Sequence, residues 1–283
     1  RNPSHQAGML SRLCSSSSWG FRWYCSAANR TLKLWGSHGV FANPSMPVAV
    51  LMLNNVLPSF VVPLWNKAVF RVCVDGGSNQ WKLLMQESSA SVGGDENGIS
   101  VALPDCVIGD MDSAMKDVQS FLEDRQVPII KESGQDNNDL DKALQFLRRQ
   151  TSQWESVVIC GGLGGRFDQE LANISTCLAN NSMPDSGISI LIDERNIVIP
   201  LPPGRYQLSM SPREGHCGIV PLGPSIRVWT DGLEFDMDGT VLKMGEFISS
   251  SNRVSGSLVS IAVKDGPFLW TASSSLQNNA TVV

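Results

Sequence analysis

Short, almost wholly apolar runs alternate with polar or amphipathic stretches from Pro47 onward, and this alternation restricts the fold more than any other feature of the chain. Runs of this kind predict strands that are buried on both faces, as in a parallel sheet covered by helices. Two intervening stretches, Asp117–Arg125 and Leu140–Arg149, carry apolar residues at three- and four-residue spacing, which indicates helices. We therefore predict a mostly parallel α/β sheet. The predicted strands are Val48–Leu53, Val69–Val74, Asp105–Ile108, Val127–Ile130, Ser156–Cys160 and Ile188–Ile192.

The character of the sequence changes after about Asn196. Glycine and proline now separate short apolar runs such as Ile226–Trp229 and Val259–Val263. Short strands divided by turns in this way favour an antiparallel β-sandwich or barrel. We predict an α/β domain over 47–190, a β-sandwich domain over 196–272, and a tail over 273–283.

Residues 1–46 differ in composition from the rest, with nine serines, five Arg or Lys residues and no Asp or Glu. This composition resembles an organellar transit segment. A non-native extension, with translation starting at Met46, is the other interpretation. We expect this extension to be disordered or transit-like, and outside the fold.

The composition of the chain argues against several classes of function. The chain of 283 residues is 42% hydrophobic and 17% charged, which is typical of a soluble protein with proper cores. A net charge of −5 gives no basic surface for nucleic acid, and no apolar run is long enough for a membrane helix. The seven cysteines form no Cys-x-x-Cys pair, so we expect a reduced protein. The chain has only three histidines, which disfavours a Ser/His hydrolase or a metal site with histidine ligands.

Carboxylates recur just after the predicted strands. The carboxyl ends of strands in an open α/β sheet face one crevice, so acids far apart in the sequence can meet there. Asp110 and Asp112 lie two residues apart in a turn that starts with Gly109, so both can reach one hard cation. The pattern predicts a magnesium and polyphosphate site. The motifs are Val74-Asp75-Gly76-Gly77, Gly109-Asp110-Met111-Asp112-Ser113, Gln135-Asp136-Asn137-Asn138-Asp139 and Gly161-Gly162-Leu163-Gly164-Gly165-Arg166-Phe167-Asp168-Gln169.

Several of these residues allow more than one interpretation. Asp139 directly precedes a predicted helix and could simply cap it. Asp75 could orient a nucleophile or cap its own turn. Arg166 suits paired phosphate oxygens, while Asp168 could fix Arg166, bind the ligand or cap the helix that follows. The glycines around Leu163 expose backbone N–H groups at a helix start, which favours an anion.

The ordered set of motifs resembles eukaryotic thiamine pyrophosphokinases, over roughly 47–271. The set comprises the four carboxylate motifs together with three later ones. The later ones are His216-Cys217-Gly218-Ile219-Val220-Pro221-Leu222-Gly223, Ser249-Ser250-Ser251-Asn252 and Pro267-Phe268-Leu269-Trp270-Thr271. The resemblance implies transfer of a pyrophosphoryl group from ATP to the thiamine hydroxyl, giving thiamine diphosphate and AMP. It also implies a homodimer whose active sites form where subunits meet.

The resemblance assigns roles residue by residue. It implies Mg²⁺ ligation by Asp110, Asp112 and Asp139. It places catalytic work on Asp75, Asp112, Asp139, Arg166 and Asp168, and nucleotide or thiamine contacts on Gly76, Gly77, Gln135, Gly164, Gly165, Arg166, Ser249, Asn252 and Trp270. A plain Ser-rich turn remains the alternative for Ser249 and Asn252, and core packing for Trp270.

The sequence departs from the family pattern at Met111, Leu140, His216 and Asn138, the last of which stands where threonine is usual. None of these removes a charge from the inferred metal site. A P-loop kinase is disfavoured because Gly-x-x-x-x-Gly-Lys-[Ser/Thr] is absent. A catalytically inactive thiamine- or nucleotide-binding protein on the same fold is the alternative function. We expect a cytoplasmic protein, or an imported one if residues 1–45 are a genuine transit segment.

Overall fold

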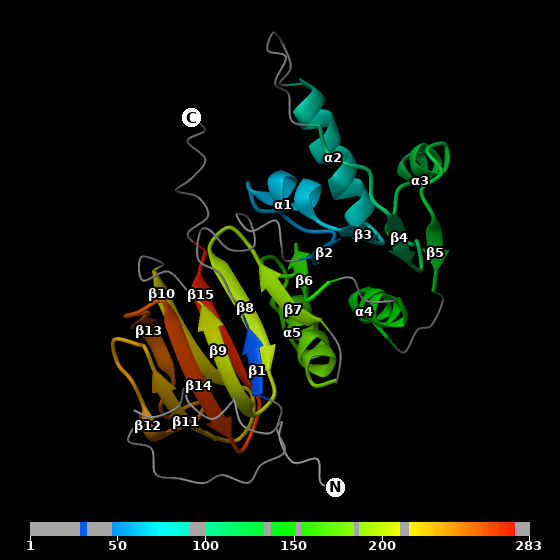
Figure 1. The fold of residues 1–283 in the computed structure, drawn as a ribbon. Helices are drawn as coiled ribbons and strands as arrows, with labels where there is room; N and C mark the ends of the chain where they lie inside the picture. Colours follow the sequence, from blue (N-terminus) through cyan, green and yellow to red (C-terminus); the bar gives the residue numbers. More distant parts are fainter. Residues whose placement is uncertain are drawn as a thin grey trace, which may run out of the picture.

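The computed structural model describes residues 29–32, 47–90, 100–132, 137–150, 154–183, 187–209 and 215–274. Their strands form one ten-stranded and one five-stranded sheet (Figure 1). The expectations for most of the N-terminal extension, for Gln135 and for most of the tail therefore fall on residues outside the described ones. Within the extension, which we expected to lie outside the fold, Asn29–Leu32 instead form strand β1, which pairs in parallel with strand β9 (Gly204–Ser209).

The six strands predicted for the α/β part are confirmed. They pair in parallel in the order β7-β6-β2-β3-β4-β5, within the ten-stranded sheet. Most of their residues are buried because helices cover both faces. The strands are β2 (Val48–Met52), β3 (Phe70–Val74), β4 (Cys106–Gly109), β5 (Ile129–Lys131), β6 (Ser156–Cys160) and β7 (Ile188–Ile192).

Two hydrophobic cores lie on the two faces of this parallel region. One face packs against α1 (Val61–Lys67), α2 (Gly77–Ala90) and α3 (Lys116–Glu123). The other packs against α4 (Asp139–Arg149) and α5 (Phe167–Asn181). Alternate residues along β2 point into opposite cores, which is the two-residue period of a strand.

The predicted β-sandwich is also confirmed, but it shares a sheet with the α/β part. Its five-stranded sheet has the order β1-β9-β14-β11-β12, and it faces the continuation β13-β10-β15-β8 of the ten-stranded sheet across a third core. The strands are β8 (Asn196–Leu201), β9 (Gly204–Ser209), β10 (His216–Pro221), β11 (Ile226–Asp231), β12 (Asp238–Leu242), β13 (Ser249–Arg253), β14 (Leu258–Lys264) and β15 (Phe268–Ser273).

The sheet changes from parallel to antiparallel where β8 pairs with β7, through Leu191↔Val198 and Ile192↔Ile197. The pairing covers only this end of β7, so the backbone of Ser189 lacks a strand partner on the β8 side. Asn181 at the end of α5 takes that place. Its Oδ1 accepts from Ser189 N–H at 2.7 Å, and its Nδ2 donates to Ser189 O at 3.0 Å and to Pro200 O at 2.8 Å. One amide therefore joins α5 to both strands.

The described helices include none that is both long and apolar enough to cross a bilayer. The five cysteines in the described residues, Cys73, Cys106, Cys160, Cys177 and Cys217, are free and buried.

We predict that Asn181→Leu lowers the free energy of unfolding by about 3 kcal/mol or more, because buried backbone groups would lose their partners. Leucine fills a similar space at this 1% exposed site but offers no hydrogen bond. Chemical denaturation measures the loss, and Ser175→Leu on the exposed side of α5 is the control. Equal stability of the two variants would contradict the structural role of Asn181.

Candidate active site

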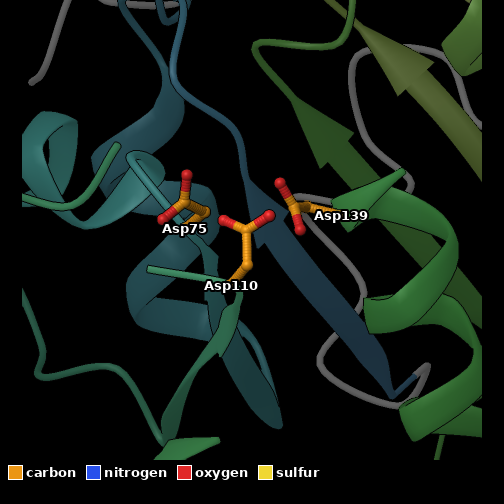
Figure 2. Close-up of side chains that lie close together, drawn as sticks. All are labelled: Asp75, Asp110 and Asp139. Carbon is orange, nitrogen blue, oxygen red and sulfur yellow. The ribbon is translucent and has the colours of Figure 1, made fainter. Parts of the chain in front are cut away.

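Three carboxylates meet at the carboxyl edge of the parallel sheet. Asp75 follows β3, Asp110 follows β4, and Asp139 is the first residue of α4. Each offers an oxygen, and these oxygens lie within 4.8 Å of one another. Figure 2 shows the three side chains close together, with Asp110 between Asp75 and Asp139. The predicted convergence of acids from separate strand ends is thus present in the structure.

Asp75 is the most buried of the three, at 5% exposure. Its Oδ2 accepts from Ser113 N–H at 3.2 Å, while its Oδ1 has no hydrogen-bond partner among the described residues. Burial raises the pKa of Asp75, and the charge of Asp139 adds to this, while hydrogen bonds from Ser113 and Gly76 act in the opposite direction. A buried, unpaired carboxylate oxygen is costly, so the site is suited to a cationic ligand.

Gly109 allows Asp75 and Asp110 to approach each other. Its φ is +154°, and a Cβ at this position would lie 2.7 Å from the Cβ of Asp75. A side chain there would push apart the ends of β3 and β4. The glycine that precedes the paired aspartates in the sequence is therefore required by the close contact of the two strand ends.

Asp112 lies in the same turn as Asp110 but outside the group of three. Its backbone N–H donates to Asp110 Oδ1 at 3.2 Å, and its Oδ1 accepts from the hydroxyl of Ser113 at 2.9 Å. The residue between the two aspartates, Met111, has a φ of +68°. The turn thus exposes Asp112 to solvent while Asp110 faces Asp75 and Asp139.

Asp139 is not the helix cap that one interpretation of the sequence suggested. Asn138 caps α4, with its side chain accepting from Asp141 N–H at 2.8 Å. The amide of Asn138 also donates to Thr176 Oγ1 at 2.8 Å. The carboxylate of Asp139 is therefore available to the site.

Lys142 is a site residue that the sequence reasoning missed. It is 8% exposed, and its Nζ lies 2.8 Å from Asp139 Oδ1 and 3.6 Å from Asp110 Oδ2. Burial acts to lower the pKa of Lys142, but the hydrogen bond and charge of Asp139, with the charge of Asp110, outweigh it and raise that pKa. The sequence did contain a signal for Lys142: it follows Asp139 by three residues, and residues three apart lie on the same face of a helix.

The predicted glycines after β3 bring two backbone segments together. A Cβ on Gly77 would lie 1.9 Å from Met52 O, and one on Gly76 would lie 2.5 Å from Asn54 Nδ2. Because Gly77 opens α2, this contact brings the start of the helix against the end of β2. Only glycine permits this approach.

The second glycine-rich loop follows β6 and opens α5. Gly164 and Gly165 have φ values of +76° and +102°. Asn55, which follows β2, donates from Nδ2 to Leu163 O at 3.1 Å and also to Gly164 O. This side chain fixes the loop against the neighbouring strand end.

Arg166 and Asp168 form an exposed salt bridge with two hydrogen bonds: Nε donates to Oδ1 at 3.1 Å, and Nη2 donates to Oδ2 at 2.5 Å. The hydrogen bonds and charge raise the pKa of Arg166 and lower that of Asp168. Of the interpretations that the sequence left open for Asp168, the structure displays the one in which it holds Arg166.

The predicted thiamine residues lie in the β-sandwich, and all three are buried. Trp270 is fully enclosed in the core between the sheets. Asn252 accepts from Phe235 N–H at 3.1 Å and donates to Phe235 O at 2.9 Å, so it holds the turn before β12. Ser249 pairs across the sheet with Ile219.

Comparisons with known proteins agree with both halves of the chain. Residues 61–190 match the model of the "Thiamin pyrophosphokinase, catalytic domain" family, and 205–267 match the "Thiamin pyrophosphokinase, vitamin B1 binding domain". Thiamine pyrophosphokinase 1 of Arabidopsis thaliana is 34% identical over 80% of this chain and 85% of its own length. Thiamine pyrophosphokinase 1 of Oryza sativa subsp. japonica is 34% identical over 81% of this chain and 88% of its own.

Solved structures share the fold. The yeast thiamin pyrophosphokinase superposes with a TM-score of 0.68 at 21% identity, covering 89% of this chain and 95% of its own. The Candida albicans enzyme gives a TM-score of 0.67 at 22% identity, covering 86% and 93%. The family matches and the relatives, taken with the carboxylates at the sheet edge, show that the chain belongs to the thiamin pyrophosphokinase family.

Proposed function

We propose that the chain is an active thiamine pyrophosphokinase, which moves the pyrophosphoryl group of ATP to the hydroxyl of thiamine and releases thiamine diphosphate and AMP. The observation that carries this proposal is the convergence of Asp75, Asp110 and Asp139 in a member of this family. An inactive binding protein on the same fold would have no need to keep three mutually repelling carboxylates together.

The donor set fits a magnesium ion. All three groups offer carboxylate oxygens, the ligands that Mg²⁺ prefers, and Asp75 Oδ1 is buried without a partner among the described residues. Asp110 and Asp139 would hold the ion with Asp75, and Asp112 stays a proposed further ligand from the same turn. A bound ion of this kind neutralises phosphate charge during transfer.

The chain's own groups would position the nucleotide. The start of α2 at Gly76 and Gly77 and the loop at Gly164 and Gly165 offer backbone close to the strand ends. The fork of Arg166 would bind phosphate oxygens, with Asp168 limiting the orientations available to it before the ligand arrives. Gln135 is proposed as a phosphate contact on the resemblance alone.

Thiamine would lie against the β-sandwich, beside β13. Asn252 fixes the turn that presents Phe235, whose side chain is 64% exposed. Ser249 begins the same strand. Trp270 is fully buried, so we expect it to support this surface by packing in the core and not to contact thiamine directly.

We also propose a homodimer with active sites at the subunit interface. The support is a group of exposed apolar side chains in and around β12 and the segments that flank it. These residues are Phe235, Val241, Met244 and Phe247. A cytoplasmic location is proposed as well, with import depending on residues 1–45.

Incubation of the protein with ATP and thiamine should yield AMP and thiamine diphosphate only when Mg²⁺ is present. Chromatography of the nucleotide and thiamine products distinguishes the outcomes. ADP with thiamine monophosphate would indicate an ordinary kinase, and the absence of product would support the binding-protein alternative.

Asp112→Ala should reduce turnover on the order of tenfold to a hundredfold, because a carboxylate beside the metal is lost. Its thermal midpoint should stay near that of the unsubstituted protein, since Asp112 is exposed. Asp117→Ala removes an exposed carboxylate from α3 and serves as the control. A lower thermal midpoint for Asp112→Ala, with no change in the Mg²⁺ dependence of its remaining rate, would count against a metal role.

A further inference from the structure

We infer that Lys142 is a positioning residue that serves as a resident cation of the acidic site. Its ammonium holds Asp110 and Asp139 together before a divalent ion arrives, and it limits the negative charge so that one divalent ion suffices. This inference rests on the proposed function, since it concerns the same three carboxylates.

The position of Lys142 supports the first part. Asp139 and Lys142 lie one turn apart on α4, while Asp110 lies in the turn after β4. The Lys142 side chain is 7% exposed, and its Nζ contacts both carboxylates. Lysine is rarely buried unless it is paired, so this side chain bridges the helix and the strand end.

The charges support the second part. Carboxylates with oxygens within 4.8 Å of one another repel strongly when all are ionised. Among the described residues, Lys142 is the cation that forms an ion pair with Asp110 and with Asp139. The three carboxylates of this group and the one ammonium leave a net charge of −2, which a single divalent ion balances; Asp112 lies outside the group and is exposed to solvent.

The contact to Asp139 leaves room for a metal. An ionised carboxylate has about four lone-pair sites, so Asp139 can accept from Lys142 and still bind a second cation. Lys142 therefore competes with a divalent ion through charge, without blocking it. Removing the ammonium should strengthen metal binding by the nucleotide-free protein. It should also lower the stability of the protein when no metal is present.

Calorimetric titration of the full chain with Mn²⁺, without nucleotide, tests this inference. Lys142→Met should bind Mn²⁺ on the order of tenfold more tightly, because a nearby positive charge is lost. Its thermal midpoint should fall in EDTA and recover with Mn²⁺ by more than that of the unsubstituted protein. Lys142→Arg keeps the charge and should retain the original affinity. Arg148→Met removes the same charge from an exposed position on α4 and should change neither property.

Other outcomes would overturn the inference. Unchanged or weaker Mn²⁺ binding by Lys142→Met is one, and failure of that variant to fold even with saturating Mn²⁺ is another. If Mn²⁺ binds neither the unsubstituted protein nor the variants, the metal role in the proposed function fails and the inference fails with it. If the Mn²⁺ results are as expected but no thiamine diphosphate forms, the inference stands and only the proposed activity fails.

Discussion

The backbone hydrogen bond from Asp75 N–H to Ile108 O, at 2.7 Å, fixes the geometry on which the site depends. It continues the parallel pairing of β3 and β4 by one residue beyond β3, so the first site carboxylate is still part of the sheet. The next residue on β4, Gly109, has no side chain, and Asp110 then leaves the sheet beside Asp75. The acidic group is thus held by backbone pairing, which no surface loop would provide.

The sequence predicted the strands of the α/β part because they are apolar on both faces, and periodicity is clear there. It was less informative about helices that contain proline. Helix α1 includes Pro63 near its start, where a missing N–H costs little. The continuous sheet could not be predicted either, since the pairing of β8 with β7 covers only two residue pairs and the amide of Asn181 completes the junction.

The candidate site, like the fold, could be predicted from the sequence only in part. Motif spacing placed Asp75, Asp110, Asp112 and Asp139 at one sheet edge; the structure brings Asp75, Asp110 and Asp139 together there and leaves Asp112 outside the group. The motifs could not separate Asp110 from Asp112, because the direction of each side chain depends on the backbone of Met111, at φ +68°. Lys142 was missed for a different reason: lysines on helices are usually solvated, and its burial follows from the packing of α4 against the sheet.

The ten-stranded sheet has a mechanical consequence for catalysis. Two substrates that bind to separate modules are often brought together by hinge closure, in which a few loop residues absorb the movement. Here β7 and β8 are hydrogen-bonded strands of one sheet, so bending at the junction would break backbone bonds and expose the amide contacts of Asn181. The halves of one chain therefore behave as a stiff frame. Under the proposed function, the two substrates would therefore be brought together by movement of loops or by a second chain, and not by a hinge between the two halves.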